Sequence, residues 1–347
     1  MNASDLAHLA WQMLEQDKGL LAIDESIATC NRRFAALGIP ETADRRRAWR
    51  ELIVTSPGLH RSIGAVILCD ETICQTTSAG GSFVSLLAEQ GIVPGIKVDA
   101  GTVELAGHEG EFITEGLDGL KARLCAYTEM GARFAKWRAV ISIGASRPSQ
   151  GCIEANAQSI ARYAAICQQV GLVPVVEPEV LMQGSHDLAR CAEVTEDMLR
   201  AVFRHAAQQG VILEAMILKP NMALPGTDCA EQADADTIAD VTVNTLLRTV
   251  PAAVPGIAFL SGGQAADHAT VRLNAMDIRF RDRMPWQLGF SFGRAIQQPA
   301  LEIWAGRDEN TLAAQDAIAR RAMCNHAARS GAYDIAMEIA PFAAAAI

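Results

Sequence analysis

Three of the five lysines in this chain lie within short apolar runs of the kind that form buried strands. Lys97 lies in Gly-Ile-Lys-Val-Asp, Lys136 in Phe-Ala-Lys-Trp-Arg, and Lys219 in Met-Ile-Leu-Lys-Pro. A buried ammonium costs desolvation free energy unless it is paired with an anion or takes part in chemistry. A primary amine, unlike a guanidinium, can lose its proton near neutral pH and attack a carbonyl to form a Schiff base. Simple ion pairing of each lysine is the alternative that the local sequence leaves open.

Charged side chains recur near the ends of the other apolar runs. Asp24 follows the first run, and the pairs Lys136 with Arg138 and Glu177 with Glu179 stand two residues apart. That spacing puts both members of a pair on one face of a strand. Charges of both signs at the ends of successive strands are typical of a reaction site, although salt-bridged packing inside a barrel uses the same residue types.

Eight short apolar runs predict the elements that would hold these side chains. The runs are 19–24, 65–69, 95–99, 134–140, 172–180, 215–220, 256–261 and 287–292. Most are continuous, as in strands covered on both faces, and helix-periodic stretches separate most of them. This pattern predicts an α/β fold, a single-domain (β/α)8 TIM barrel with additional N- and C-terminal helices. The extra helices would lie over Leu6 to Leu14 and over 300–332. We expect the barrel to span 1–333 and a C-terminal tail to span 334–347.

The composition argues against several function classes. A net charge of −10 and a pI near 5.2 argue against binding to nucleic acid or to an anionic membrane surface. There is no apolar run long enough for a membrane span. The nine cysteines form no Cys-x-x-Cys pair, which argues against a zinc ribbon. Their odd number and the absence of a secretory signal predict reduced thiols and a cytoplasmic protein.

The segments after the last two runs have residues that would bind a phosphate. Glycines in Ser261-Gly-Gly-Gln264 let backbone N–H groups approach an anion closely. Gly293-Arg294 would add a helix N-terminus and a guanidinium. Barrels often bind phosphate at these two loops, but a pair of tight turns would use the same glycines.

With these residues in view, the chain resembles class I fructose-bisphosphate aldolase, the Schiff-base type. The matching segments, in the family's order over nearly the whole chain, are Lys18-Gly-Leu-Leu-Ala-Ile-Asp-Glu-Ser26, Gly95-Ile-Lys-Val-Asp99, Gly116-Leu-Asp-Gly119, Phe134-Ala-Lys-Trp-Arg138, Val176-Glu-Pro-Glu179, Leu218-Lys-Pro-Asn-Met222, Phe259-Leu-Ser-Gly-Gly-Gln264 and Phe290-Ser-Phe-Gly-Arg294. The resemblance implies a metal-independent lyase of glycolysis and gluconeogenesis, without a cofactor. It would reversibly cleave fructose 1,6-bisphosphate to dihydroxyacetone phosphate and glyceraldehyde 3-phosphate.

The resemblance also implies a role for each of five catalytic residues. Lys219 matches the amine that condenses with the substrate ketone, and Lys136 would be a nearby cation that helps to free its lone pair. Glu177 matches the acid that protonates the carbinolamine hydroxyl. Glu179 would hydrogen-bond and pair with the lysines. Two carboxyls so close push their pKa values apart, so that one can hold a proton near neutral pH. Asp24 matches the base that takes the C4 hydroxyl proton during carbon–carbon cleavage.

Substrate contacts carry over in the same way. Ser261, Gly262 and Arg294 match the site for the C1 phosphate. The C6 phosphate and the sugar backbone would be contacted by Ser26, Thr29, Arg33, Lys97 and Arg138. The chain departs from the family within 27–33 and at position 100, which is alanine where a second lysine is common. These departures concern selectivity for the C6 phosphate more than the chemistry at C2 to C4.

Three other functions remain as alternatives. A metal-dependent aldolase needs clustered histidine ligands, but none of the seven histidines falls in a predicted strand or forms His-x-x-His spacing. A Schiff-base barrel acting on another phosphosugar, such as a transaldolase, is disfavoured by the two phosphate sites. A non-catalytic phosphosugar-binding protein is disfavoured because every matched chemical residue is present.

The C-terminal segment is the largest departure from the family. Many related aldolases end in a mobile tail whose terminal tyrosine assists proton exchange, whereas 334–347 contains no tyrosine. We expect this tail to pack as an apolar plug or a subunit contact through Ile339, Phe342 and Ile347, with no part in proton transfer. A disordered end is the alternative. The resemblance further implies a homotetramer whose ligand is a phosphosugar.

Overall fold

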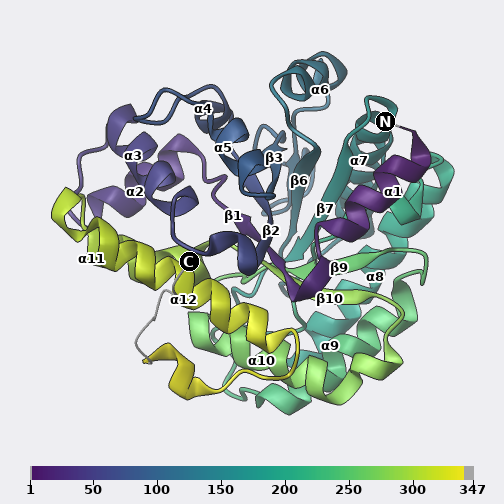
Figure 1. The fold of residues 1–347 in the computed structure, drawn as a ribbon. Coiled ribbons are helices and arrows are strands. Elements are labelled where there is room, and N and C mark those ends of the chain that lie inside the picture. Colours follow the sequence, from purple (N-terminus) through teal and green to yellow (C-terminus); the bar gives the residue numbers. More distant parts are fainter. Residues whose placement is uncertain (1, 340–347) are drawn as a thin grey trace.

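Eight parallel strands close into a barrel in the computed structural model, which describes residues 2–339 (Figure 1). Around the barrel the strand order is β1-β10-β9-β8-β7-β6-β3-β2. The strands are β1 (Gly19–Ala22), β2 (Ile63–Leu68), β3 (Val93–Lys97), β6 (Phe134–Ile141), β7 (Val173–Val180), β8 (Ile217–Leu218), β9 (Gly256–Phe259) and β10 (Gln287–Phe292). Every predicted apolar run overlaps one of them, so the predicted (β/α)8 TIM barrel is confirmed.

Helices surround the barrel. They are α1 (Ala3–Gln12), α2 (Ile27–Ala35), α3 (Ala43–Val54), α4 (Asp70–Ile73), α5 (Phe83–Glu89), α6 (Leu120–Glu129), α7 (Gln150–Gln169), α8 (Leu188–Gln208), α9 (Ala235–Thr249), α10 (Ala266–Phe280), α11 (Arg294–Trp304) and α12 (Thr311–Ala328). Short 3-10 turns are η1 (Glu15–Asp17), η2 (Leu59–Arg61), η3 (Leu213–Ala215), η4 (Arg281–Arg283), η5 (Asp308–Asn310) and η6 (Ile335–Glu338). None of the helices in the described part of the chain is long and apolar enough to cross a membrane.

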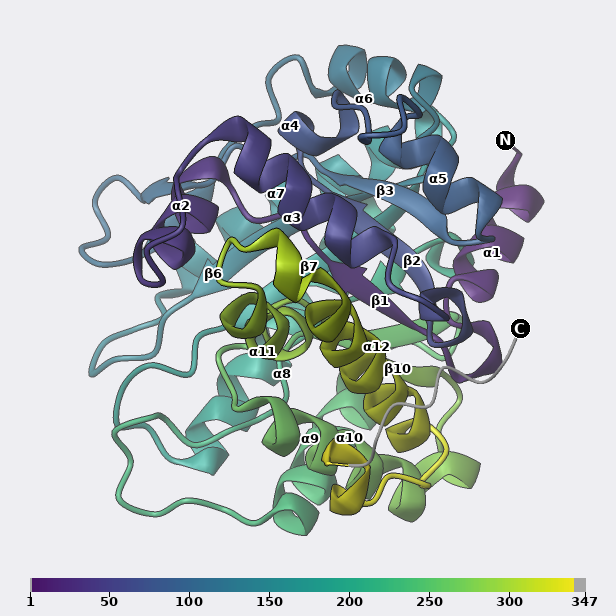
Figure 2. The same cartoon turned by 60° about the vertical axis from the view of Figure 1, so that its left-hand side comes forward.

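The helical region predicted over 300–332 is two helices rather than one. Ala305 and Gly306 both adopt left-handed backbone conformations, with φ of 45° and 72°, and these end α11. The chain then turns into α12, which packs beside α3 and against α10 and α11 (Figure 2). The helical character was therefore predicted correctly, and the break was not.

The N-terminal helix closes one end of the barrel. Leu6, Leu9 and Ala10 of α1 are buried together with the apolar side chains that fill the lower barrel interior. The chain passes so close to the strands that a Cβ at Gly64 would lie 2.4 Å from the Met13 carbonyl oxygen. Only glycine fits that approach. The predicted N-terminal helix is confirmed, and it leaves the other end of the barrel for chemistry.

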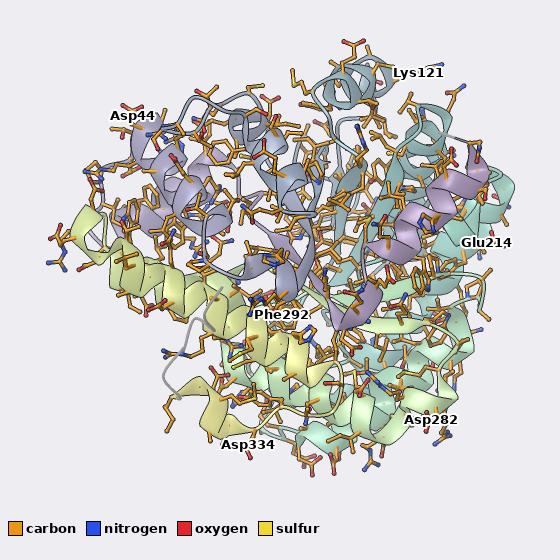
Figure 3. The ribbon with its side chains drawn as sticks, viewed as in Figure 1. Asp44, Lys121, Glu214, Asp282, Phe292 and Asp334 are labelled. Atoms are coloured by element: carbon orange, nitrogen blue, oxygen red, sulfur yellow. The ribbon has the colours of Figure 1, made fainter. Side chains whose placement is uncertain are left out.

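Inward-facing side chains change from apolar to charged along the strands. On β7, alternate positions share a face and run Val173, Val175, Glu177, Glu179. The outward face of the strands stays apolar, as at Phe292 of β10, which is fully buried beneath the helices. Charged residues outside the barrel, such as Asp44, lie at the periphery of the molecule (Figure 3). The alternation therefore gathers charge inside the C-terminal end of the barrel.

An antiparallel hairpin that the sequence did not indicate follows β3. It consists of β4 (Thr102–Glu104) and β5 (Phe112–Thr114). Every residue of β4 is exposed, so β4 lacks the apolar run that marks a buried strand. The hairpin nevertheless lies beside β6, where Thr114 is buried.

The segment after Tyr333 is docked on α12 through Glu338. Its carboxylate pairs with Arg321 and accepts a hydrogen bond from the Tyr333 hydroxyl at 2.9 Å. Ile339 is 85% exposed, so a plug within the protomer through this residue is wrong, whereas a subunit contact stays a prediction. Phe342 and Ile347 lie outside the described residues. The division of the chain at 333 also stays a prediction.

Candidate active site

A cavity of about 680 Å³ opens at the C-terminal ends of the strands. All the residues that the sequence proposed for catalysis and substrate binding line it. They are Asp24, Ser26, Thr29, Arg33, Lys97, Lys136, Arg138, Glu177, Glu179, Lys219, Ser261, Gly262 and Arg294. They come from seven different strand ends and from α2, so the closed barrel brings together residues that lie far apart in sequence.

Four buried charges form a continuous chain across the floor of this cavity. Lys219, directly after β8, places its Nζ 3.1 Å from Glu177 Oε1. Lys136 Nζ lies 2.8 Å from Glu177 Oε2 and 2.8 Å from Asp24 Oδ2. Each of these residues is at most 8% exposed. Buried charges are tolerated here because each has a partner of opposite sign.

The charges of the two lysines on the cavity floor keep the carboxylates of Asp24 and Glu177 ionised. Burial raises the pKa of Asp24, but the charges of Lys136 and Lys219 outweigh burial and lower it from 3.8 to about 2. For Glu177, burial is likewise outweighed by the same two lysines, and its pKa is lowered. Burial lowers the pKa of Lys136, whereas Asp24 and Glu177 raise it further, so the net shift is upward.

One sequence prediction about the glutamates is corrected by this geometry. Glu179 was expected to pair with the lysines, but its ion pair is with Arg138, whose Nε lies 2.5 Å from Glu179 Oε2. That one of the two carboxyls holds a proton near neutral pH stays a prediction, and the charges of Lys136 and Lys219 lower the pKa of Glu177. The β6–β7 register puts Arg138 beside Glu177, one step below Glu179 on the same face, so its long side chain can reach upward.

One end of the cavity has the features of an anion site. Gly262 and Gly263 adopt left-handed conformations with φ of 57° and 93°, as glycine readily does. Arg294 begins α11 directly after Gly293, and a Cβ at Gly263 would lie 3.4 Å from its Nη2. Ser261, at the end of β9, lines the same end. Backbone N–H groups, a helix N-terminus and a guanidinium therefore converge here.

A second group of polar side chains comes from α2, its neighbours and the end of β3. Ser26 caps α2 by accepting a hydrogen bond from the Thr29 N–H at 3.3 Å. Arg33 pairs with Glu25 at 2.7 Å, and Glu25 is held in turn by the fully buried Arg50 at 2.8 Å. The Gln297 amide of α11 also donates to Glu25, at 2.7 Å. Lys97 pairs with Asp99 at 2.6 Å.

The sequence did not identify several residues of this network as part of the site. Glu25, Asp99, Gly263 and Ser291 lie within segments that match the family, but the sequence assigned no role to them. Arg50 and Gln297 carried no signal, because they lie within helices, α3 and α11, rather than at the end of an apolar run. Among residues 2–339, no group of three or more His, Cys, Asp or Glu side chains is arranged to hold a metal ion.

Comparison with known proteins assigns this arrangement to a family. The family model described as "Glycolytic: Fructose-bisphosphate aldolase class-I" matches residues 5–344. A protein of Xylella fastidiosa named as a probable class 1 fructose-bisphosphate aldolase is 52% identical over 332 residues, 95% of this chain and 99% of its own length. A cytoplasmic fructose-bisphosphate aldolase isozyme of Pisum sativum is 51% identical over 91% of this chain and 88% of its own.

A solved structure agrees with these sequence relatives. It is fructose-bisphosphate aldolase from Plasmodium falciparum, determined in complex with TRAP and a small-molecule inhibitor. It superposes with a TM-score of 0.94 at 42% identity, and the match covers 96% of each chain. The resemblance inferred from the sequence motifs is confirmed by all three comparisons.

Proposed function

The chain belongs to the class I fructose-bisphosphate aldolases, lyases that need no metal and cleave fructose 1,6-bisphosphate through a lysine Schiff base, and we propose that Lys219, Glu177, Lys136 and Asp24 carry this reaction here. The observation that supports the assignment most strongly is the unbroken contact chain Lys219–Glu177–Lys136–Asp24 on the cavity floor. It joins an amine, a proton carrier, a fixed cation and a base.

The first step forms the imine. Lys219 passes a proton to Glu177, which lies 3.1 Å away, and the freed amine attacks C2 of the sugar to give a carbinolamine. Protonated Glu177 then gives that proton to the carbinolamine hydroxyl, which leaves as water. This order of events reconciles an ionised Glu177 in the free site with its action as an acid in the reaction.

The second step breaks the C3–C4 bond. Asp24 takes the proton of the C4 hydroxyl, the C3–C4 electron pair moves toward the iminium, and glyceraldehyde 3-phosphate leaves an enamine on Lys219. A carboxylate with a pKa of about 2 is a weak base, so the transfer depends on the iminium as electron sink. Lys136 holds Asp24 ionised in the free site and keeps its carboxyl oriented while it takes the proton. Protonation of C3 and hydrolysis of the imine then release dihydroxyacetone phosphate.

Two phosphate-binding ends would fix the substrate across the barrel. We assign the C1 phosphate to Ser261, Gly262 and Arg294, after β9 and β10. The remaining contacts, assigned to the C6 phosphate and the sugar backbone, are Ser26, Thr29, Arg33, Lys97 and Arg138. In the strand order the pair β9–β10 stands opposite the pair β3–β6, with β7 and β8 between them on one side and β1 and β2 on the other. This supports a substrate that spans the cavity over Lys219, from Arg294 to Lys97 and Arg138.

Reductive trapping tests the assignment of the nucleophile. Borohydride added with dihydroxyacetone phosphate should reduce the imine and leave one substrate mass on the peptide that contains Lys219. The matched control is Lys219→Arg, which keeps the positive charge but cannot form an imine. Labelling of the Lys136 or Lys97 peptide in the intact protein would overturn the assignment.

We also propose that the enzyme is a cytoplasmic homotetramer. The location is supported by the Pisum sativum relative and by a relative of Arabidopsis thaliana, whose names describe cytoplasmic and cytosolic isozymes. The exposed Ile335 and Ile339, 60% and 85% accessible in the protomer, supply apolar surface that a subunit contact would cover. Light scattering of the purified protein measures the number of subunits directly.

A further inference from the structure

The β6 strand continues past the end of its neighbour β3. The ladder between them pairs Gly95 with Phe134, Ile96 with Ala135 and Lys97 with Lys136, and β3 ends at that point. Strand β6 runs on to Ile141. The backbone groups of β6 that face beyond the end of β3 therefore need other partners.

Two side chains satisfy the backbone of Arg138 on this edge. Its N–H donates to Asp99 Oδ2 at 3.4 Å, and its carbonyl accepts from the Thr114 hydroxyl at 2.7 Å. Thr114 lies on β5 and is 3% exposed. The hydrogen bonds of Asp99 and Thr114 thus replace one further backbone pairing between β3 and β6. Thr114, which lies on the hairpin after β3, supplies one of these two hydrogen bonds.

The same Asp99 carboxylate holds Lys97. Its Oδ1 lies 2.6 Å from Lys97 Nζ and accepts from the Gly101 N–H at 3.2 Å, and the Asp99 side chain is only 3% exposed. Lys97 and Lys136 are direct cross-strand neighbours, so two like charges stand side by side. Asp99 offsets that repulsion, because its charge acts on Lys136 as well as Lys97.

We propose that Asp99 and Thr114 are positioning residues that fix Lys97 and Arg138 for the C6-phosphate end of the substrate. Asp99 fixes the position of the Lys97 ammonium. Through its hydrogen bond with the backbone N–H of Arg138, it also fixes the point from which the Arg138 side chain extends. Thr114 holds the backbone of Arg138 by donating a hydrogen bond to its carbonyl. Side-chain cations that are already held in place bind a phosphate without the entropy cost of being ordered on binding. This inference rests on the proposed function, in which Lys97 and Arg138 contact that end.

Comparison of two substrates tests the inference. Fructose 1-phosphate has the C1 phosphate and the same reacting carbons but lacks the C6 phosphate. Asp99→Asn should raise KM for fructose 1,6-bisphosphate by about tenfold, as for loss of one charge-assisted hydrogen bond, with kcat nearly unchanged. KM for fructose 1-phosphate should change by less than about twofold. Thr114→Val should raise KM for fructose 1,6-bisphosphate by about threefold. The conservative Thr114→Ser, which keeps the hydroxyl, should have wild-type values.

Reductive trapping with dihydroxyacetone phosphate separates the possible failures. Equal losses on both substrates, with normal trapping at Lys219, would overturn the positioning role and leave the proposed function standing. Absence of trapping at Lys219 in the unsubstituted enzyme would overturn the proposed function itself. If Asp99→Asn does not fold, the Thr114 variants decide, and wild-type discrimination between the two substrates in Thr114→Val would refute the inference.

Discussion

Replacement of Lys136 by methionine perturbs the centre of the buried charge chain. Methionine resembles lysine in shape but carries no charge, so Asp24 and Glu177 both lose a partner at 2.8 Å. Removal of one member of a buried ion pair costs about 3–5 kcal/mol, because the remaining charge is uncompensated. We expect Lys136→Met to lower the free energy of unfolding at pH 7 by about this amount.

The loss of unfolding free energy in Lys136→Met, relative to the wild type, should become smaller as the pH falls. In the wild type the pKa of Asp24 is lowered to about 2, so its contribution to stability is complete above about pH 4 and is lost only as the pH falls toward 2. In the variant the largest lowering charge is gone, and burial raises the pKa of Asp24. A carboxyl whose folded pKa is raised destabilises the protein when ionised, and this cost disappears as the carboxyl is protonated. The difference between the two proteins should therefore be smaller at pH 5 than at pH 7.

Urea unfolding followed by circular dichroism at pH 7 and pH 5, at equal protomer concentration, measures this difference. Lys136→Arg is the matched control, because it retains a cation between the carboxylates. A deficit for Lys136→Met below about 1 kcal/mol at pH 7, the range of an exposed ion pair, would refute the reasoning. So would a deficit of equal size at both pH values.

Other substitutions separate chemistry from binding. Lys219→Arg should abolish turnover in a coupled cleavage assay while the circular dichroism spectrum stays unchanged. Arg294→Ala should raise KM by about tenfold to a hundredfold through the lost contact to phosphate, whereas Asp24→Asn should lower kcat and leave imine trapping intact; equal loss of trapping in both would contradict this division. Deletion after Tyr333 should leave kcat within a few-fold but lower Tm because Glu338 is lost, and a hundredfold fall in kcat with the fold intact would show that the tail has a catalytic role.

The barrel could be predicted because its strands carry a strong local signal. Strands covered on both faces need continuous apolar runs, and each run marks a strand whatever its neighbours are. The β4–β5 hairpin gave no such signal, because β4 is exposed throughout. The break at Ala305 was also not predicted, since alanine rarely adopts the left-handed conformation that ends α11 there, although Gly306 directly after it is a residue that often follows a helix end.

The site residues were predictable for a related reason, and their partners were not. A parallel barrel collects whatever follows its strands, so charges at strand ends had to meet. Which charges pair depends on register and side-chain reach. Glu179 therefore pairs with Arg138 rather than with a lysine, and Gln297 bonds Glu25 across a separation of 272 residues. No local pattern contains such a contact.

The partners of the three cavity lysines support the different roles that we propose for them. Lys136 is held by two carboxylates that raise its pKa, which favours its charged form and disfavours a role as the nucleophile. Lys97 is bound by both the carboxylate and the carbonyl of Asp99. Lys219 has one ion pair, at 3.1 Å, to a carboxylate that Lys136 already holds. Transfer of its proton to that carboxylate disrupts the fewest contacts, and it produces the free amine and the acid that imine formation requires.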